Sequence, residues 1–505
     1  MHYVSLIVEF LRGRPALVFW TAALTQAALW VFLPALFYSA PPGDVPDVLA
    51  IGHEFRLGSH LGPPLAFWLA ELSFKIAGTF GVYLLAQVCV VIALWVVYAL
   101  GRAIVGTRHA VLAVLLMAGV ALFSVPTPDF GPSVLAMPLW ALALLHYWRA
   151  VGEGSRGNWF MLAIELGLLL LTSYAGLILL VLLVAFSIIN ERARSAFKFA
   201  EPWIAILFVL FVLAPHLVWL HTSGGGIDTA LGYLAAGGFA ASAGARLLLS
   251  FVLAHFGLVL LVALASGWPR QRRERAPTIE RKPADMFGRI YIYFFALMPL
   301  ALAVLVALLM GRIAPLQKLA PFAVLSGLAI IVAAGDQVRI YRENIASFAW
   351  VGLLISPPVL VVLAILFLPW TYPTELRIAQ PANDMGRFFA ENFQRRTGQP
   401  LAFVAGDPRV ASLVALGAPS RPSLILEGAP ERSPWATPDE IRDKGAILVW
   451  PMTDIAGTPP ADLKARFPDL VPEVPRVFAR GVQGFLPLIR IGWAMIRPQT
   501  SAPAN

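Results

Sequence analysis

The chain has 505 residues, of which 59% are hydrophobic and 13% charged, and its mean hydropathy is +0.75. This composition excludes a soluble globular protein as the whole chain. The formal net charge is +9, but the basic residues gather in loops between apolar segments, so they indicate membrane orientation and no nucleic-acid partner. The single cysteine, Cys89, lies in an apolar segment and excludes a disulfide framework within the chain.

The first apolar segment follows a short amphipathic stretch that ends in Arg12 and Arg14. We expect this segment to be an uncleaved signal anchor, because no cleavable signal peptide is visible. Further apolar segments follow, and each is expected to be a helix because lipid offers no partner for unpaired backbone groups. The sequence predicts an α-helical polytopic membrane protein with about eleven transmembrane helices, near residues 16–38, 80–100, 110–125, 133–150, 159–172, 174–190, 203–220, 245–267, 290–310, 319–335 and 346–370.

The charges of the connecting loops predict the orientation of these spans. If the N-terminus is cytoplasmic, the basic clusters near 102–108, 149–156, 192–198, 268–289 and 339–342 all lie inside. The outside loop 221–245 contains no Lys or Arg. An odd number of spans then places residues 371–505 outside. We therefore predict a multi-pass protein of a bacterial inner (plasma) membrane with a cytoplasmic N-terminus and a periplasmic C-terminal domain.

The C-terminal tail differs in composition from the rest of the chain. Short apolar runs near 401–406, 423–428, 446–452 and 476–480 alternate with expected helices near 408–418, 437–445 and 461–467. Strands that alternate with helices predict a small α/β domain. The predicted division is a transmembrane domain, 1–370, and a periplasmic α/β domain, 371–505.

The first outside loop, 39–79, concentrates polar residues in a chain that has few of them. A helix is expected from Pro46, because proline suits a first helical turn and Asp47 is favourable there. Its apolar residues would form one face that rests in the membrane interface, with its acidic side toward a cavity. That apolar face is expected to hold Val48, Ile51 and Phe55, and Asp47 and Glu54 would lie on the opposite side.

A second helix is expected later in the same loop, with Trp68 as an interfacial anchor and Glu71 and Lys75 paired at i,i+4. The alternative, of equal weight, is a solvated connecting loop whose charges have no further role. The polar residues of the loop that are candidates for a site are Asp44, Asp47, His53, Glu54, Arg56 and His60.

Outside this loop, Asp129, Tyr174 and His216 are candidates for the same cavity. Each one alone is also typical of a turn residue or of a hydrogen-bonded residue near the end of a span. Two carboxylates on one membrane face could divide the work, one taking a proton from an acceptor hydroxyl and the other orienting it. No spacing matches a metal-ligand set, so we expect no metal or other cofactor, although a divalent cation is possible.

Residues Leu57 to Leu69 follow the pattern Leu-Gly-x-x-x-x-Pro-Pro-Leu-x-x-Trp-Leu after an outside Asp and a helix. This pattern resembles the bacterial dolichyl-phosphate-mannose-protein mannosyltransferase-like family, glycosyltransferase family 39. Relatives with the GT-C fold include the aminoarabinose and galacturonosyl transferases of lipid A. The resemblance extends in order over about residues 15–370, and it includes the segment 127–151, which contains Asp129, and the segments near 168–180 and 214–220.

The resemblance implies a GT-C-like membrane glycosyltransferase that moves a sugar from a polyprenyl-phosphate donor to an envelope lipid, glycan or protein acceptor on the periplasmic side. It matches Asp44 to the catalytic base and Asp129 to a second acid, with Asp47 as the alternative base. His53, Glu54, Arg56, His60, Tyr174 and His216 would then contact substrate.

The chain departs from the family pattern at three positions. Gly62 stands where relatives commonly have His before the two prolines, Ser173 where they often have Lys, and Val45 where an acid commonly follows the first Asp. A degenerate, non-catalytic family member is therefore one alternative. A lipid or sugar transporter is another, although charges are rare within the spans, with Glu165 as an exception.

Overall fold

The computed structural model describes residues 9–59, 61–125, 129–222, 238–267, 278–281, 283–311, 316–429, 433–452, 457–468 and 470–499. The chain forms two compact units. The helical unit comprises Met1–Phe32, Leu57–Ala66 and Phe80–Val359. The C-terminal unit comprises Leu33–Arg56, Phe67–Thr79 and Leu360–Asn505, so it contains most of the first loop as well as the tail. The division predicted at residue 370 stays a prediction.

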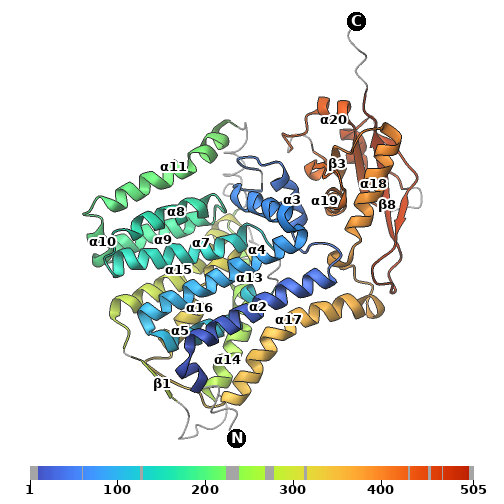
Figure 1. The fold of residues 1–505 in the computed structure, drawn as a ribbon. Helices are drawn as coiled ribbons and strands as arrows, with labels where there is room; N and C mark the ends of the chain where they lie inside the picture. Colours follow the sequence, from blue (N-terminus) through green and yellow to red (C-terminus); the bar gives the residue numbers. More distant parts are fainter. Residues whose placement is uncertain are drawn as a thin grey trace. The chain divides into compact units, whose positions relative to one another are not determined.

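Helices occupy every predicted span, which confirms the helical membrane fold class (Figure 1). Within the described residues, six helices are long and apolar enough to cross a bilayer. They are Pro15–Phe37 (α2), Leu65–Val105 (α4), Pro132–Gly152 (α7 and η1), Glu201–Thr222 (α11), Met286–Met310 (α15) and Glu343–Thr371 (α17). Ala241–Ala254 (α13) and Phe256–Ser266 (α14) form a seventh span if the 48° bend between them lies within one crossing.

Shorter apolar helices fill the other predicted spans, so the number of eleven crossings stays a prediction. These are Thr107–Met117 (α5), Asn158–Leu170 (α8), Gly176–Ile189 (α9) and Lys318–Ala333, which includes Ser326–Ala333 (α16). Three short elements, Ala121–Ser124 (α6), Glu191–Ala196 (α10) and the 3-10 turn Leu316–Ala323 (η2), connect them. Two short strands, Thr278–Glu280 (β1) and Gln337–Arg339 (β2), pair antiparallel between the later helices.

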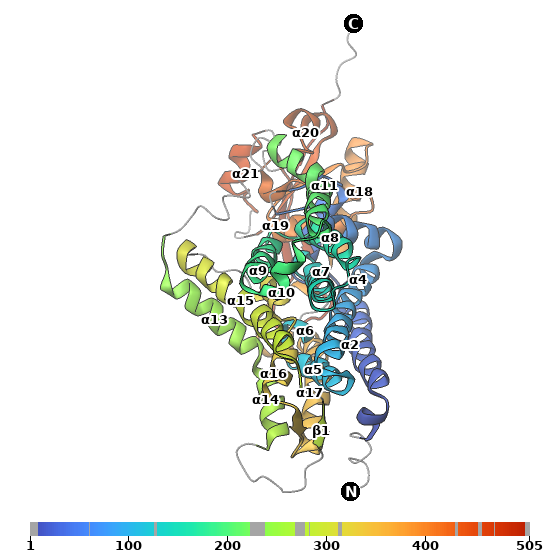
Figure 2. The ribbon, with the colours of Figure 1, turned by 90° about the vertical axis from the view of Figure 1, so that its left-hand side faces the viewer.

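The core of the helical unit is aromatic, and its outer face is apolar. The Tyr147 hydroxyl lies 2.6 Å from Ser187 Oγ, and the Tyr147 ring packs among Phe186, Tyr291 and Phe295. Helix α8 packs against both α7 and α11, and α13 packs against α15 (Figure 2). On α11, the Phe211 side chain is 73% exposed. Trp203, Leu207 and Val218 of the same helix are also exposed, and a row of exposed apolar side chains on one long helix agrees with a multi-pass membrane protein in contact with lipid.

The sheet of the C-terminal unit has the strand order β4-β3-β5-β8-β6, and β7 also pairs with β8. Strand β3 is parallel to β4 and β5, whereas β8 runs antiparallel to β5, β6 and β7. The strands are Phe403–Gly406 (β3), Ser423–Leu424 (β4), Ala446–Pro451 (β5), Val471–Pro472 (β6), Arg476–Phe478 (β7) and Ile489–Ile496 (β8). The helices are Ala382–Thr397 (α18), Pro408–Gly417 (α19), Pro438–Lys444 (α20) and Ala461–Arg466 (α21), so the small α/β domain is confirmed.

The first loop forms the helix that the sequence predicts, Val45–His53 (α3). Val48 and Ile51 are buried, as expected, and α3 packs against α19 within the C-terminal unit. The prediction for Phe55 is wrong. The helix ends at His53, so Phe55 lies outside it with a φ of 47°, and its side chain is 46% exposed and not on the buried face. The face predicted to rest in the membrane interface therefore packs at least partly on protein.

The second loop helix is the first part of α4. It begins at Leu65, and its backbone leaves helical geometry at Ala77 and Gly78, where Gly78 has a φ of 59°. Trp68 donates from Nε1 to the carbonyl oxygen of Arg56 at 2.9 Å. The side chain expected to be an interfacial anchor thus fixes the end of the segment that follows α3.

Candidate active site

Asp44 directly precedes α3 and is its N-cap residue. Its backbone carbonyl accepts a hydrogen bond from Val48 N at 2.9 Å, whereas its side chain is exposed and makes no capping hydrogen bond. Gly43, with a φ of 52°, forms the turn before it, and Arg377 donates to the Gly43 carbonyl at 2.9 Å. The Asp44 carboxylate is thus exposed at the N-terminus of a helix whose backbone is held by hydrogen bonds.

Asp47 lies in the first turn of α3 and is half-buried. Burial raises the pKa of this carboxyl, an effect opposed by the Arg377 charge and by Ser412 and reinforced by the Asp44 charge. Its Oδ1 atom is buried without a hydrogen-bond partner among the described residues. The geometry therefore distinguishes the two acids, one exposed and one enclosed, as surroundings do in sites that divide acid and base roles.

Glu54 follows α3 and is also half-buried. Burial raises its pKa, and Ser423, His53 and Arg56 act in the opposite direction. Arg56 itself is exposed and donates to the carbonyl of Pro434 at 3.3 Å. Both residues thus contact the tail of the chain within the C-terminal unit.

His53 makes its contact with Glu71, which is 1% exposed. The His53 Nδ1 atom lies 3.1 Å from Glu71 Oε1, and Arg421 donates to Glu71 Oε2 at 2.7 Å. The predicted Glu71 and Lys75 pair is present, but its 4.0 Å separation makes it the weakest of these contacts. Arg421 was not predicted, because nothing in its local sequence indicates contact with a residue 350 positions earlier.

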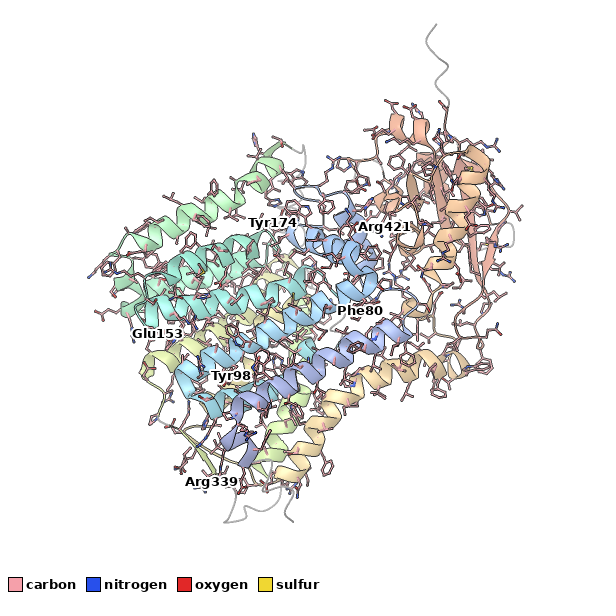
Figure 3. All side chains as sticks on the ribbon, in the orientation of Figure 1. Phe80, Tyr98, Glu153, Tyr174, Arg339 and Arg421 are labelled. Atoms are coloured by element: carbon pink, nitrogen blue, oxygen red, sulfur yellow. The ribbon has the colours of Figure 1, made fainter. Side chains whose placement is uncertain are left out.

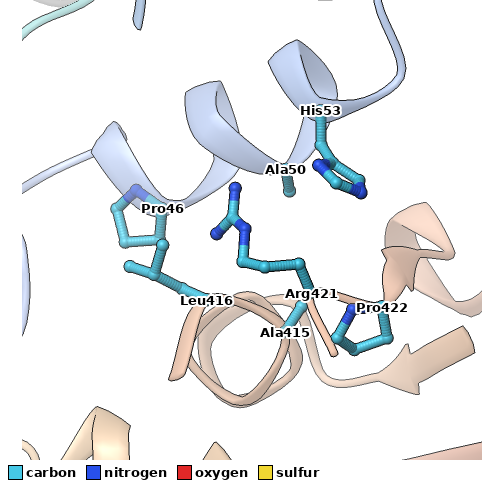
Figure 4. Close-up of a pocket in the computed structure, with 7 residues that line it drawn as sticks. All are labelled: Pro46, Ala50, His53, Ala415, Leu416, Arg421 and Pro422. Carbon is cyan, nitrogen blue, oxygen red and sulfur yellow. The ribbon is translucent and has the colours of Figure 1, made fainter. Parts of the chain in front are cut away.

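A small cavity lies beside this ion pair (Figure 4). Its volume is about 10 Å³, room for about one water molecule and far too little for a sugar. The residues that line it are Pro46, Ala50, His53, Ala415, Leu416, Arg421 and Pro422. Figure 4 shows Arg421 reaching between α3 and α19. On this side, His53 packs against protein and has no space for substrate.

In the helical unit, Tyr174 and His216 lie in contact (Tyr174 is labelled in Figure 3), whereas their place in a substrate cavity stays a prediction. His216 Nδ1 lies 2.7 Å from the carbonyl oxygen of Leu57, so that nitrogen carries the proton. Its Nε2 atom then accepts from the Tyr174 hydroxyl at 3.1 Å. The Trp219 ring stacks on His216, and Gly58 packs against that indole. These contacts fix the start of the segment that carries the Leu-Gly-x-x-x-x-Pro-Pro pattern.

Asp129 is half-buried just before Phe130, which is fully buried. It belongs to the helical unit, and Asp44 belongs to the C-terminal unit. Their convergence in one cavity stays a prediction. His60 lies outside the described residues.

Two departures from the family pattern have local structural explanations. Gly62 has a φ of 137°, a conformation that side chains rarely adopt, and it forms two backbone hydrogen bonds of 3.1 Å with Ser59. A histidine at position 62 would require a different turn. Ser173 Oγ accepts from Ala175 N at 3.2 Å and so stabilises the turn before α9.

No group of three or more His, Cys, Asp or Glu side chains within the described residues is arranged to hold a metal ion. The sequence-based expectation of no metal stays a prediction. A mechanism with a carboxylate base does not need a metal ion for the proton transfer, because a positioned carboxylate can accept the proton of an acceptor hydroxyl.

Solved structures that match over nearly the whole length of both chains include two of one protein. The apo crystal structure of ArnT from Cupriavidus metallidurans matches with a TM-score of 0.53 and 12% identity, covering 98% of this chain and 99% of that chain. The structure of the same protein bound to undecaprenyl phosphate matches with a TM-score of 0.54 and 12% identity, covering 97% and 99%. No curated protein sequence matches the chain.

An oligosaccharyltransferase from Archaeoglobus fulgidus in the apo form has a TM-score of 0.46 at 14% identity, covering 94% of this chain and 75% of that chain. The two ArnT matches establish the class: this chain is a membrane protein with the GT-C fold. Residues 62–219 also match the family model described as dolichyl-phosphate-mannose-protein mannosyltransferase. The resemblance expected from the sequence is therefore confirmed. The family model confirms it for residues 62–219, and the ArnT structures confirm the fold over nearly the whole chain.

Proposed function

We propose that this protein is a membrane glycosyltransferase that takes a sugar from a polyprenyl-phosphate donor. The observation that carries the proposal is the exposed Asp44 carboxylate at the N-terminus of α3, on a backbone held by Arg377, in a chain with the fold of ArnT. One solved ArnT structure is bound to undecaprenyl phosphate. A donor of this lipid class is the natural counterpart for a site at a membrane surface.

The proposed reaction needs only a base, a polyprenyl-phosphate sugar and an acceptor hydroxyl. The oxygen of an acceptor hydroxyl attacks the anomeric carbon of the sugar, and Asp44 takes the hydroxyl proton. The bond between the anomeric carbon and the phosphate oxygen breaks, and polyprenyl phosphate leaves with the electron pair. Asp129 is proposed to orient the acceptor, and Asp47 is the alternative base. The exposed Arg56 offers a cation for the phosphate.

The proposed location is a bacterial inner (plasma) membrane, with the N-terminus cytoplasmic and the C-terminal domain periplasmic. The acceptor would be an envelope lipid, glycan or protein. The basic loops and the acidic first loop support this orientation, because positive charge collects on the cytoplasmic side.

The direct test uses the full chain in lipid nanodiscs with a panel of undecaprenyl-phosphate monosaccharides and an envelope lipid extract. We expect at least one donor to release undecaprenyl phosphate in a manner that depends on both time and acceptor. No release with any donor, from protein that elutes as a folded monodisperse species, would favour the non-catalytic alternative that Gly62 and Ser173 suggest. Uptake of intact donor into sealed vesicles without cleavage would favour the transporter.

A further inference from the structure

The C-terminal unit contains two arginines that bind the first loop from the tail of the chain. Arg377 lies in the 3-10 turn Arg377–Ala379 (η3), after α17. Arg421 lies between α19 and β4. Each lies more than 300 residues along the chain from its first-loop partner, Gly43 for Arg377 and Glu71 for Arg421, and neither arginine belongs to the predicted site.

Arg377 acts on the backbone next to Asp44. It donates from Nη1 to Gly43 O at 2.9 Å and from Nη2 to Ser412 Oγ at 3.2 Å, and its charge faces Asp47. The neighbouring carbonyl of Ile378 accepts from Ser39 N at 2.9 Å and from Ala40 N at 3.1 Å. Three hydrogen bonds thus join the η3 turn to the five residues that precede Asp44.

Arg421 acts on the other end of α3. It pairs with the buried Glu71 at 2.7 Å, and Glu71 in turn contacts His53, the last residue of α3. The guanidinium also lies 4.5 Å from the centre of the Phe74 ring. A charge-assisted contact to a buried carboxylate is strong, and its loss leaves an uncompensated buried charge.

We propose that Arg377 and Arg421 are positioning residues that hold α3 at both ends, so that sugar transfer at Asp44 requires the C-terminal domain. This inference rests on the proposed function. The domain is then part of the catalytic apparatus without touching the reacting atoms. The small cavity beside Arg421 agrees with this role, because it has no space for a sugar.

The test compares Arg377→Gln and Arg421→Gln with Arg442→Gln in the full chain in nanodiscs. Arg442 is a matched control, because its pair with Asp439 at 3.4 Å lies in the same unit but is exposed. Hydrogen exchange of peptides that cover Val45–His53 is the first readout. We expect exchange to accelerate about tenfold in both test variants, because α3 opens locally without its anchors, and to stay unchanged in the control.

The second readout is undecaprenyl phosphate release from the donor that the wild type uses. We expect kcat to fall about tenfold or more in both test variants, with KM within about twofold, because a misplaced base affects the reacting geometry more than binding. Arg421→Lys should restore part of the rate. A general loss of folding would lower the amount of monodisperse protein and not change kcat alone.

A third variant covers the case in which Arg421→Gln fails to fold. The double variant Glu71→Gln with Arg421→Gln removes both buried charges. Its increase in hydrogen exchange over Val45–His53 and its loss of kcat should therefore be no larger than those of Arg421→Gln alone. Two results would overturn the proposal. One is hydrogen exchange over Val45–His53 that stays at the wild-type rate in both Arg377→Gln and Arg421→Gln. The other is a kcat in both variants equal to that of the Arg442→Gln control. If the wild type transfers no sugar from any donor, the proposed function fails, and exchange alone decides whether these arginines hold α3.

Discussion

Asp44 and Asp47 lie less than one helical turn apart, yet their surroundings differ. Asp44 is exposed, whereas Asp47 is half-buried, faces Arg377 and has one oxygen without a hydrogen-bond partner among the described residues. An acceptor hydroxyl can approach an exposed carboxylate from solvent, and an enclosed carboxylate serves better to shape the site. This contrast favours Asp44 over Asp47 as the base.

Replacement of Asp44 by Asn tests that assignment. The amide keeps the size of the side chain but cannot accept a proton, so kcat should fall by about 10²- to 10⁴-fold. Undecaprenyl phosphate release measures the rate. Asp439→Asn is the control, because Asp439 is an exposed acid of the same unit. A rate of Asp44→Asn within about twofold of the control would remove Asp44 as the base.

Glu54 predicts a pH dependence of stability. Burial raises its pKa in the folded protein, so the folded state holds the proton more tightly than the unfolded state does. Stability from this group is present at low pH and is lost as pH rises from the ordinary carboxyl range through the raised pKa. Glu54→Gln has no such loss, because glutamine does not titrate. The midpoint of thermal unfolding of Glu54→Gln minus that of the wild type should therefore be larger at about pH 7.5 than at about pH 4. The same difference in midpoint at both pH values would contradict this prediction.

The polar candidates could be found from the sequence because charge is rare in this chain, but their partners could not. Asp44, Asp47 and Glu54 stand out in an apolar sequence. Arg377 and Arg421 look like ordinary arginines of a polar tail, and only the tertiary fold brings them to Gly43 and Glu71. Sequence spacing also favoured the Glu71 and Lys75 pair, whereas the burial of Glu71 makes Arg421 its main partner.

At the scale of elements, α3 depends on close approach to the start of α4. A Cβ added at Gly52 would lie 2.2 Å from the carbonyl oxygen of Phe67 and 3.0 Å from Glu71 Cβ. The first of these contacts is with backbone, so a flexible side chain cannot relieve it. Glycine at position 52 therefore permits the distance at which His53 reaches Glu71.

Gly52→Ala should push α3 away from α4 and weaken the contact between His53 and Glu71. We expect a midpoint of thermal unfolding at least about 2–4 °C lower than wild type, as for a loss near 1 kcal/mol. Gly481→Ala is the control, because its Cβ would lie at an ordinary 3.5 Å from Ser39 Oγ. Equal midpoints for the two variants would show that α3 does not need this close approach.

The elements found from the sequence are those with clear local signals. Pro46 and Asp47 indicated the start of α3, and the apolar run of β5 indicated a buried strand. The longest strand, β8, was missed because Arg490 and Gly492 interrupt its apolar pattern. The helix α18 was missed because its sequence is polar and carries only a narrow apolar face.

At the scale of the whole molecule, hydropathy predicted the membrane fold and loop charge predicted its orientation. The exposed apolar residues of α11 agree with lipid contact. Hydropathy alone could not assign the first loop to the same compact unit as the tail, because that assignment depends on contacts between distant residues. The proposed reaction requires this unit to face the side opposite to the basic loops.

Cysteine labelling in intact cells tests that requirement most directly. Cys89 is the only cysteine and is buried, so Cys89→Ala gives a clean background. Asp443→Cys places a thiol on α20, and Ser195→Cys places one in the basic loop of α10; both positions are exposed. The predicted result is that a membrane-impermeant maleimide labels Asp443→Cys in intact spheroplasts, and Ser195→Cys only after permeabilisation. Labelling of both positions under the same condition would contradict the predicted orientation and the proposed site.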